Sequence, residues 1–125
     1  MIKQRFLLIT GGHTHGEEKW DSLRDQVFVL DVERNFWTEL PSQFNLNKAR
    51  SQHSSCTTNE KAFVYGGGDE DSMEFINLEE LLLIDGASEE PKWTQIVLKP
   101  ELSRQEALMA VASPTKIIVL GGYVG

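Results

Sequence analysis

Three glycine doublets recur at one fixed spacing along this chain of 125 residues. They are Gly11-Gly12, Gly66-Gly67 and Gly121-Gly122, and each doublet begins 55 residues after the one before it. The chain has 10 glycines, so a random order would give only about one doublet, with no reason for equal spacing. A period of this length indicates a repeated structural unit whose copies pack on their neighbours.

Each doublet closes a short apolar run, at 6–10, 62–65 and 117–120. Short runs rich in β-branched and aromatic residues and stopped by glycine are typical of buried strands. Each of the first two doublets is followed, in the same order, by an apolar run that ends in an aspartate, by a tryptophan and by an arginine. These landmarks are Asp31 and Asp85, Trp37 and Trp93, and Arg50 and Arg104.

This order of landmarks resembles the kelch repeat family, in which arginine, apolar strand, Gly-Gly, long loop, second strand with aspartate and tryptophan follow one another. The resemblance covers nearly all of the chain and implies an all-β fold, a kelch-type β-propeller segment of four-stranded antiparallel blades. It also implies that the indoles of Trp37 and Trp93 fill the gaps between neighbouring blades. On this interpretation Trp37→Ala would nearly unfold the domain.

The repeat divides the chain into a partial blade at 1–51, a complete blade at 52–105 and the first half of a third blade at 106–125. We expect strands at 5–10, 27–32, 36–40, 52–57, 61–66, 79–84, 92–97, 106–111 and 116–121. Met73 to Leu83 also holds many good helix formers, so a helical turn at 72–78 is an alternative there. The register favours a strand that ends next to Asp85, because Asp85 then stands where Asp31 does.

A propeller needs at least about four blades to close its ring, and this count gives fewer. We therefore expect a longer parent chain, or assembly with other chains that covers the open blade edges. Open edges that stay uncovered would be prone to pairing with other chains.

The charge balance is acidic, with 19 Asp and Glu against 12 Lys and Arg and a formal net charge of −7. This balance disfavours binding to nucleic acid or to an anionic membrane and favours a basic partner. The single cysteine, Cys56, allows no internal disulfide, and the sequence contains no apolar run of 18 residues. From the residues Met1 to Phe6, which lack an apolar leader segment, we expect no secretory signal. We expect a cytoplasmic protein without a cofactor.

Two long loops, at 13–26 and 68–80, are the candidate binding sites, because loops carry function where strands are used in packing. Trp20 is a candidate aromatic anchor for a protein partner, and the acidic residues would attract a basic segment of that partner. The candidate partner-binding residues are Glu17, Glu18, Trp20, Asp69, Glu70, Asp71 and Phe75. The alternatives are that Trp20 packs on a neighbouring loop and that the acidic run is a solvated face.

The resemblance implies a non-catalytic protein–protein interaction module. The alternatives are a structural or cytoskeletal scaffold subunit and a fragment of a kelch-like metal-dependent enzyme. His13 and His15 could bind a metal, but no third ligand stands near them in the sequence. Cys56 is more simply explained as a small buried hydrophobe than as a nucleophile, and Arg50 and Arg104 are expected to pair with carboxylates or carbonyls within the fold.

Overall fold

A computed structural model describes residues 2, 5–12, 24–67, 72–84, 88–97 and 105–122. Most of the secondary structure in these residues is antiparallel β-strand, which confirms the all-β class. The elements are β1 (Phe6–Thr10), β2 (Val27–Asp31), β3 (Phe36–Glu39), a 3-10 turn (Ser42–Phe44), β4 (Ser54–Thr57), β5 (Lys61–Tyr65), β6 (Ser72–Asn77), α1 (Leu78–Leu83), β7 (Thr94–Val97), β8 (Leu108–Ser113) and β9 (Lys116–Leu120).

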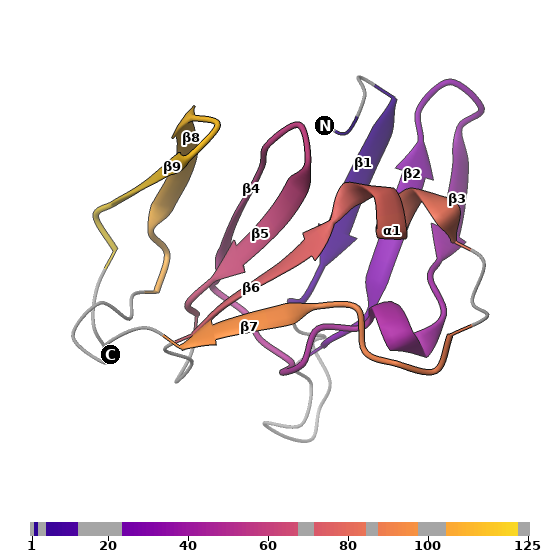
Figure 1. Cartoon of the computed structure of the whole chain (residues 1–125), viewed down its shortest axis with the longest axis horizontal. Helices are drawn as coiled ribbons and strands as arrows, with labels where there is room; N and C mark the ends of the chain where they lie inside the picture. The colour runs from indigo at the N-terminus through magenta and orange to yellow at the C-terminus, as the bar shows by residue number, and fades with distance from the viewer. Residues whose placement is uncertain are drawn as a thin grey trace, which may run out of the picture.

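The strands form three sheets, ordered β1-β2-β3, β4-β5-β6-β7 and β8-β9. Figure 1 shows the three sheets side by side in chain order, and α1 directly follows β6 of the second sheet. The described residues form a row of sheets and no closed ring. The unit boundaries after residues 51 and 105 stay a prediction.

The pairing register fixes which side chains share a face of the first sheet, because directly paired residues point the same way. Leu8 pairs with Val29 and belongs to the face that packs on the core. We call this the inner face. It meets the second sheet at Ala62, Val64 and Ile76, which are almost fully buried. Residues of the opposite parity form the outer face, which points away from the second sheet.

The glycine doublets have a common backbone conformation that explains their residue type. All six glycines have a positive φ between 66° and 94°, a region that side chains other than glycine rarely adopt. At Gly67 a Cβ atom would also collide with the backbone of Ser51 and His53. The doublets therefore end the strands and allow the next connecting segment to approach closely.

The expected strand at 79–84 is wrong, and so is the alternative helical turn at 72–78. The strand lies earlier, at β6, and α1 follows it directly. Leu78 to Leu83 are good helix formers, two glutamates lie in the first turn where the helix dipole favours them, and Leu78 and Leu81 are buried on one side. Asn77 pairs with Lys61 as Asp31 pairs with Phe6, so Asn77 and not Asp85 stands at the position of Asp31.

The expected burial of Trp37 is also wrong. Its side chain is 51% exposed, whereas Trp93 is 3% exposed. Trp37 lies in β3 and pairs with Leu30, so it points from the outer face of the first sheet, which no described sheet covers. Trp37→Ala should therefore cost about 1 kcal/mol or less and not unfold the domain.

The described residues contain no helix that is both long and apolar enough to cross a membrane.

An ion pair between Arg5 and Asp31 holds the end of the first sheet. The guanidinium donates from Nε to Oδ1 at 3.0 Å and from Nη2 to Oδ2 at 2.8 Å. The backbone N–H groups of Glu33 and Arg34 also donate to Asp31 Oδ1. The Arg5 hydrogen bond is the main cause that lowers the pKa of Asp31 from 3.8 to about 2.

We expect a pH-dependent stability contribution from Asp31. A carboxylate whose pKa is lowered by folding stabilises the protein above its unfolded pKa and loses this contribution as the pH falls. The difference in Tm between the wild type and Asp31→Asn should be constant at neutral pH and shrink between pH 3.8 and about 2. Thermal unfolding followed by circular dichroism at a series of pH values measures it. A difference that persists unchanged at pH 2 would refute the pairing.

Candidate interaction surface

One face of the second sheet, at Trp93, is covered by another segment of the chain. Trp93 directly precedes β7, and its indole Nε1 donates to the carbonyl of Phe44 at 2.5 Å. The backbone N–H of Lys92 donates to the carbonyl of Gln43 at 2.9 Å, and Asn47 Nδ2 donates to the carbonyl of Trp93 at 3.0 Å. The segment that connects the first sheet to the second thus lies across the second sheet and covers this indole.

A buried ion pair lies on the same face of the second sheet. Arg50 Nη2 donates to Glu74 Oε2 at 2.5 Å, and the two residues are 1% and 0% exposed. Arg50 Nη1 also donates to the carbonyls of Gly66 and Ser72, and the backbone N–H of Asn47 donates to Glu74 Oε1. Burial raises the pKa of Glu74, while the Arg50 charge acts in the opposite direction. Arg50 therefore ties the connecting segment to β6.

The outer face of the first sheet carries the same kind of surface, and no segment among the described residues covers it. Leu7, Leu30 and Trp37 lie in one row across β1, β2 and β3, and Ile9, Phe28 and Glu39 lie in the next row. Leu7 and Ile9 lie at the same distances before the first glycine doublet as Ala62 and Val64 lie before the second. They therefore occupy in β1 the positions that Ala62 and Val64 occupy in β5. By the same register, Trp37 occupies the position of Trp93 and Phe28 occupies that of Glu74.

Equivalent positions in the two sheets thus differ in burial and not only in residue type. Leu7 and Ile9 are exposed, whereas Ala62 and Val64 are each 1% exposed. Large exposed apolar patches mark interaction surfaces in soluble proteins. The outer face, defined by Leu7, Ile9, Phe28, Leu30 and Trp37, is therefore the candidate interaction surface.

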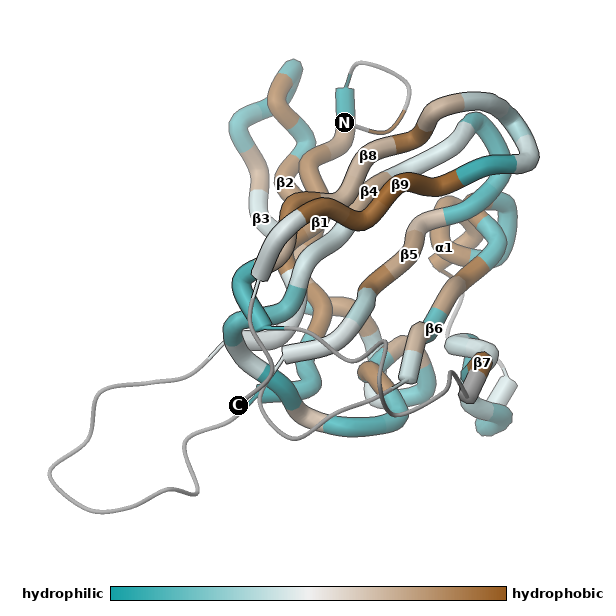
Figure 2. The backbone as a smooth tube through the Cα atoms, turned by 90° about the vertical axis from the view of Figure 1, so that its left-hand side faces the viewer, coloured by the Kyte–Doolittle hydropathy of each residue, from teal (hydrophilic) through white to brown (hydrophobic). Residues whose placement is uncertain are grey.

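A second open face lies at the other end of the row of sheets. Leu108 pairs with Leu120 and Ala110 pairs with Ile118, so these four side chains share one face of the third sheet. All four are exposed. Figure 2 shows β9 as hydrophobic along most of its length. The row of sheets therefore has an uncovered apolar face at each end.

Among the candidate partner-binding residues, Phe75 alone belongs to the described residues. It lies in β6, half-buried, with its ring centroid 5.8 Å from that of Phe63 and Lys61 Nζ 4.6 Å from its centroid. These contacts place Phe75 in the sheet, not at the tip of a loop. The other candidates, Glu17, Glu18, Trp20, Asp69, Glu70 and Asp71, lie outside the described residues, as do the landmarks Asp85 and Arg104.

The outer face was not among the binding sites expected from the sequence. The sequence does show that both faces of these strands are apolar. Leu7 and Ile9 lie on the same face of β1, and Phe28 and Leu30 lie on the same face of β2. These runs are apolar at nearly every position, so they predict a strand with two buried faces. Only the arrangement of the sheets reveals that one of those faces is uncovered.

Burial shifts the pKa values of two reactive side chains in the part of the chain that the structure describes. Burial raises the pKa of the Cys56 thiol, which disfavours the thiolate that a nucleophile needs. Burial, and then the Arg50 charge, lower the pKa of His53. No group of three or more His, Cys, Asp or Glu that could hold a metal ion occurs within the described ranges. His13 and His15 lie outside them.

The chain is similar in sequence to a protein of known name. Acyl-CoA-binding domain-containing protein 4 of Arabidopsis thaliana is 35% identical over 69 residues, which are 55% of this chain and 10% of that protein. The chain thus aligns with about a tenth of the relative's length. No family model matches the chain.

These comparisons contradict the assignment to the kelch family. A kelch chain should match a model of that family, and none matches here. The curated relative is named for an acyl-CoA-binding domain. The regular spacing of glycines, aspartate, tryptophans and arginines is a property of the sequence, but it is not sufficient to assign this family.

Proposed function

We propose that this chain is a non-catalytic protein–protein interaction module and that the outer face of the β1-β2-β3 sheet binds the partner. The observation that carries the proposal is the contrast between Trp93, covered by the chain itself, and Trp37, which is uncovered at the equivalent position. Tryptophan is enriched among the residues that dominate binding energy at protein interfaces. The partner therefore takes the place that the segment around Phe44 takes over Trp93.

The chemistry of the face defines the kind of partner that suits it. An apolar surface should cover Leu7, Leu30 and Trp37, and a backbone carbonyl should accept the indole N–H as the carbonyl of Phe44 does in the second sheet. Glu39 lies on the same face, and the chain has a formal net charge of −7. A basic residue beside the apolar surface of the partner would therefore add attraction that salt weakens.

We propose further that the three sheets are part of a radial stack of the β-propeller kind, completed by a longer parent chain or by other chains. In support, each sheet faces the next with the same strand parity, and both end faces of the row are apolar and open. The second open face, at Leu108, Ala110, Ile118 and Leu120, also favours a second candidate function, that of a structural subunit in a larger assembly.

Acyl-CoA binding, which the name of the Arabidopsis relative states for that protein, is not part of this proposal. Coenzyme A is a phosphorylated nucleotide derivative, and sites for phosphate groups use lysine, arginine or helix N-termini. Two pockets formed by the described residues, of about 390 and 830 Å³, are lined by neither lysine nor arginine. The aligned part of that relative is a tenth of its length.

A comparison of two charged variants tests the proposed surface. Trp37→Glu should abolish capture of the partner from a cell extract on immobilised protein, because a carboxylate in the centre of an apolar interface is left desolvated and unpaired. Leu120→Glu, on the opposite end face, is the matched control and should capture the partner of the first sheet as the wild type does, even if it loses proteins that bind the third sheet. Quantitative mass spectrometry of the captured proteins compares the three. Capture that is equal for wild type and Trp37→Glu would contradict the proposal.

A further inference from the structure

Among the described residues, one edge of the first sheet is open, and this edge adjoins the outer face at Leu7 and Ile9. In the second sheet β4 pairs with β5, and in the third sheet β8 pairs with β9. β1 has the same place before its glycine doublet as β5 and β9, but no described strand pairs with its second edge. Within the described ranges, the first sheet thus has no strand at the position that β4 and β8 occupy in the other two sheets.

The backbone of β1 shows which groups this edge leaves unpaired. The N–H and C=O of Phe6 both bond to Ile2, at 2.9 and 2.8 Å, so the backbone of Phe6 points away from β2. Leu8 and Thr10 point the same way, because hydrogen-bonding direction alternates along a strand. At the far end, Gly12 N–H donates to the carbonyl of Arg50 at 2.6 Å.

The chain therefore closes both ends of this edge and leaves its middle open. The His53 imidazole takes part in a hydrogen bond with the backbone of Thr10. The N–H and C=O of Leu8 and the N–H of Thr10 have no hydrogen-bond partner among the described residues. Unpaired strand edges of this kind are templates for another strand.

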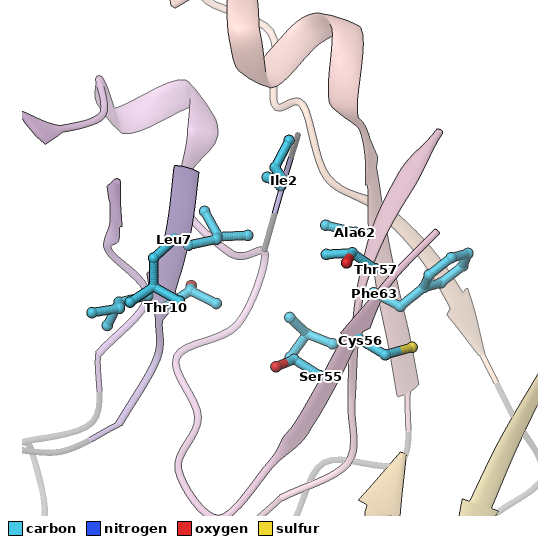
Figure 3. A pocket seen from close by; sticks show the side chains of 11 residues that line it. Ile2, Leu7, Thr10, Ser55, Cys56, Thr57, Ala62 and Phe63 are labelled. Atoms are coloured by element: carbon cyan, nitrogen blue, oxygen red, sulfur yellow. The ribbon is translucent and has the colours of Figure 1, made fainter. Parts of the chain in front are cut away.

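A pocket of about 390 Å³ lies beside these unpaired groups. Figure 3 shows its walls, with β1 on one side, β4 and β5 on the other, and Ile2 near one end. The lining residues are Ile2, Leu7, Leu8, Ile9, Thr10, Ser55, Cys56, Thr57, Ala62, Phe63 and Val64. None of them is charged, and those contributed by β4 are small, so an uncharged and narrow segment suits the pocket.

We propose that this pocket, the β1 edge groove, binds an extended segment of another protein, which adds to the first sheet as a strand antiparallel to β1. The pairing of β4 with β5 and of β8 with β9 shows how such a strand would pair with β1. Phe63 stands where Leu8 stands and pairs with Cys56, and Ile118 at the same place pairs with Ala110. The bound segment therefore places a small side chain, such as alanine, serine or cysteine, opposite Leu8.

The length of the bound segment follows from the two closed ends of the edge. The open groups are the N–H and C=O of Leu8 and the N–H of Thr10, so about three residues of the bound segment can pair, which is about 10 Å of extended chain at 3.3 Å per residue. Strand addition gives affinity through main-chain hydrogen bonds and specificity through the pockets for alternate side chains. The groove accordingly selects an uncharged, extended segment with small side chains over one with bulky ones.

The probe is a fluorescent peptide that copies residues 53–58 with Cys56→Ala, matched with the same peptide N-methylated on the backbone of that alanine. Fluorescence anisotropy gives the two affinities, and NMR hydrogen exchange reports the Leu8 and Thr10 amides. We expect the first peptide to bind and to slow exchange at these two amides. The methylated peptide should bind about tenfold more weakly or worse, because it loses a donor and clashes with the edge. Absence of binding, equal affinity, or protection confined to other amides would overturn the proposal.

Two protein variants locate the site further. Ser55 lines the groove and is exposed, so Ser55→Phe should fill the groove and abolish peptide binding, whereas Ser42→Phe, at an exposed position in the 3-10 turn, should not. Trp37→Glu should leave peptide binding unchanged, which separates this site from the outer face. Retained binding in a folded Ser55→Phe protein would overturn the proposal, and if this variant does not fold, the peptide pair decides.

Discussion

Trp93→Ala should destabilise the protein by about 3 to 5 kcal/mol, the usual cost of removing a large buried aromatic side chain. Trp93 is 3% exposed, belongs to the core cluster, and donates its indole N–H to the carbonyl of Phe44. The total stability of a chain of this length is about 6 to 19 kcal/mol at 0.05 to 0.15 kcal/mol per residue. Urea denaturation followed by circular dichroism should therefore show a large fall in the midpoint.

The matched control is the same substitution at the equivalent position of the first sheet. Trp37→Ala should change the free energy of unfolding by about 1 kcal/mol or less, because this indole is half-exposed and none of the described segments covers it. Trp93→Phe should fall between the two, because it keeps most of the packing and loses the hydrogen bond. Equal losses at Trp37 and Trp93 would show that the outer face of the first sheet is not open.

Glu74→Met should cost about 3 to 5 kcal/mol, because it leaves the guanidinium of Arg50 buried without its carboxylate. Arg50 is 1% exposed and its other acceptors are the carbonyls of Gly66 and Ser72 and the hydroxyl of Ser72. Neutral acceptors cannot balance a full charge in an apolar surrounding. The free energy of unfolding from chemical denaturation measures the loss.

A double-mutant cycle separates the buried charge from the lost contacts. Arg50→Met should be destabilising by a similar amount, and the double variant Arg50→Met/Glu74→Met should be clearly more stable than the sum of the two single losses predicts. The remaining loss in the double variant belongs to the carbonyls of Gly66 and Ser72 and to the N–H of Asn47, which lose their side-chain partners. Strict additivity of the two single substitutions would contradict the role of the pair.

The sequence was sufficient to predict most strands because their signals are local. The glycine doublets stop β1, β5 and β9, and all six glycines have the positive φ for which glycine is suited. The charge of Arg50 predicts that it pairs with a carboxylate or with carbonyls in the fold. The sequence did not identify Glu74 as that carboxylate. An arginine buried in a fold needs a carboxylate or carbonyls wherever these come from.

Two parts of the fold depended on information that the local sequence does not hold. Leu78 to Leu83 suit a helix or a buried strand equally well by apolar pattern, and the choice depends on Asn77 already ending β6. Trp37 and Trp93 stand in similar sequence surroundings, yet one is exposed and the other buried. The difference arises from whether another segment covers the sheet, which is a property of the arrangement of the sheets.

The candidate surface was harder to predict than the strands for the same reason. The sequence analysis searched the loops for binding residues, and six of its seven partner-binding candidates lie outside the described residues. The outer face consists of ordinary apolar strand residues, which would be core residues if a further sheet covered them. Its candidacy as a binding site follows from its exposure in combination with the equivalence of Trp37 to Trp93.

Hydrogen exchange of the indole N–H groups, measured by NMR, tests the open outer face most directly. Single Trp→Phe variants assign the indole signals of the three tryptophans. The account predicts slow exchange for Trp93, whose N–H is bonded to the carbonyl of Phe44 and buried, and fast exchange for Trp37 in the free chain. An indole of Trp37 that is as protected as that of Trp93 in the free monomer would contradict the account.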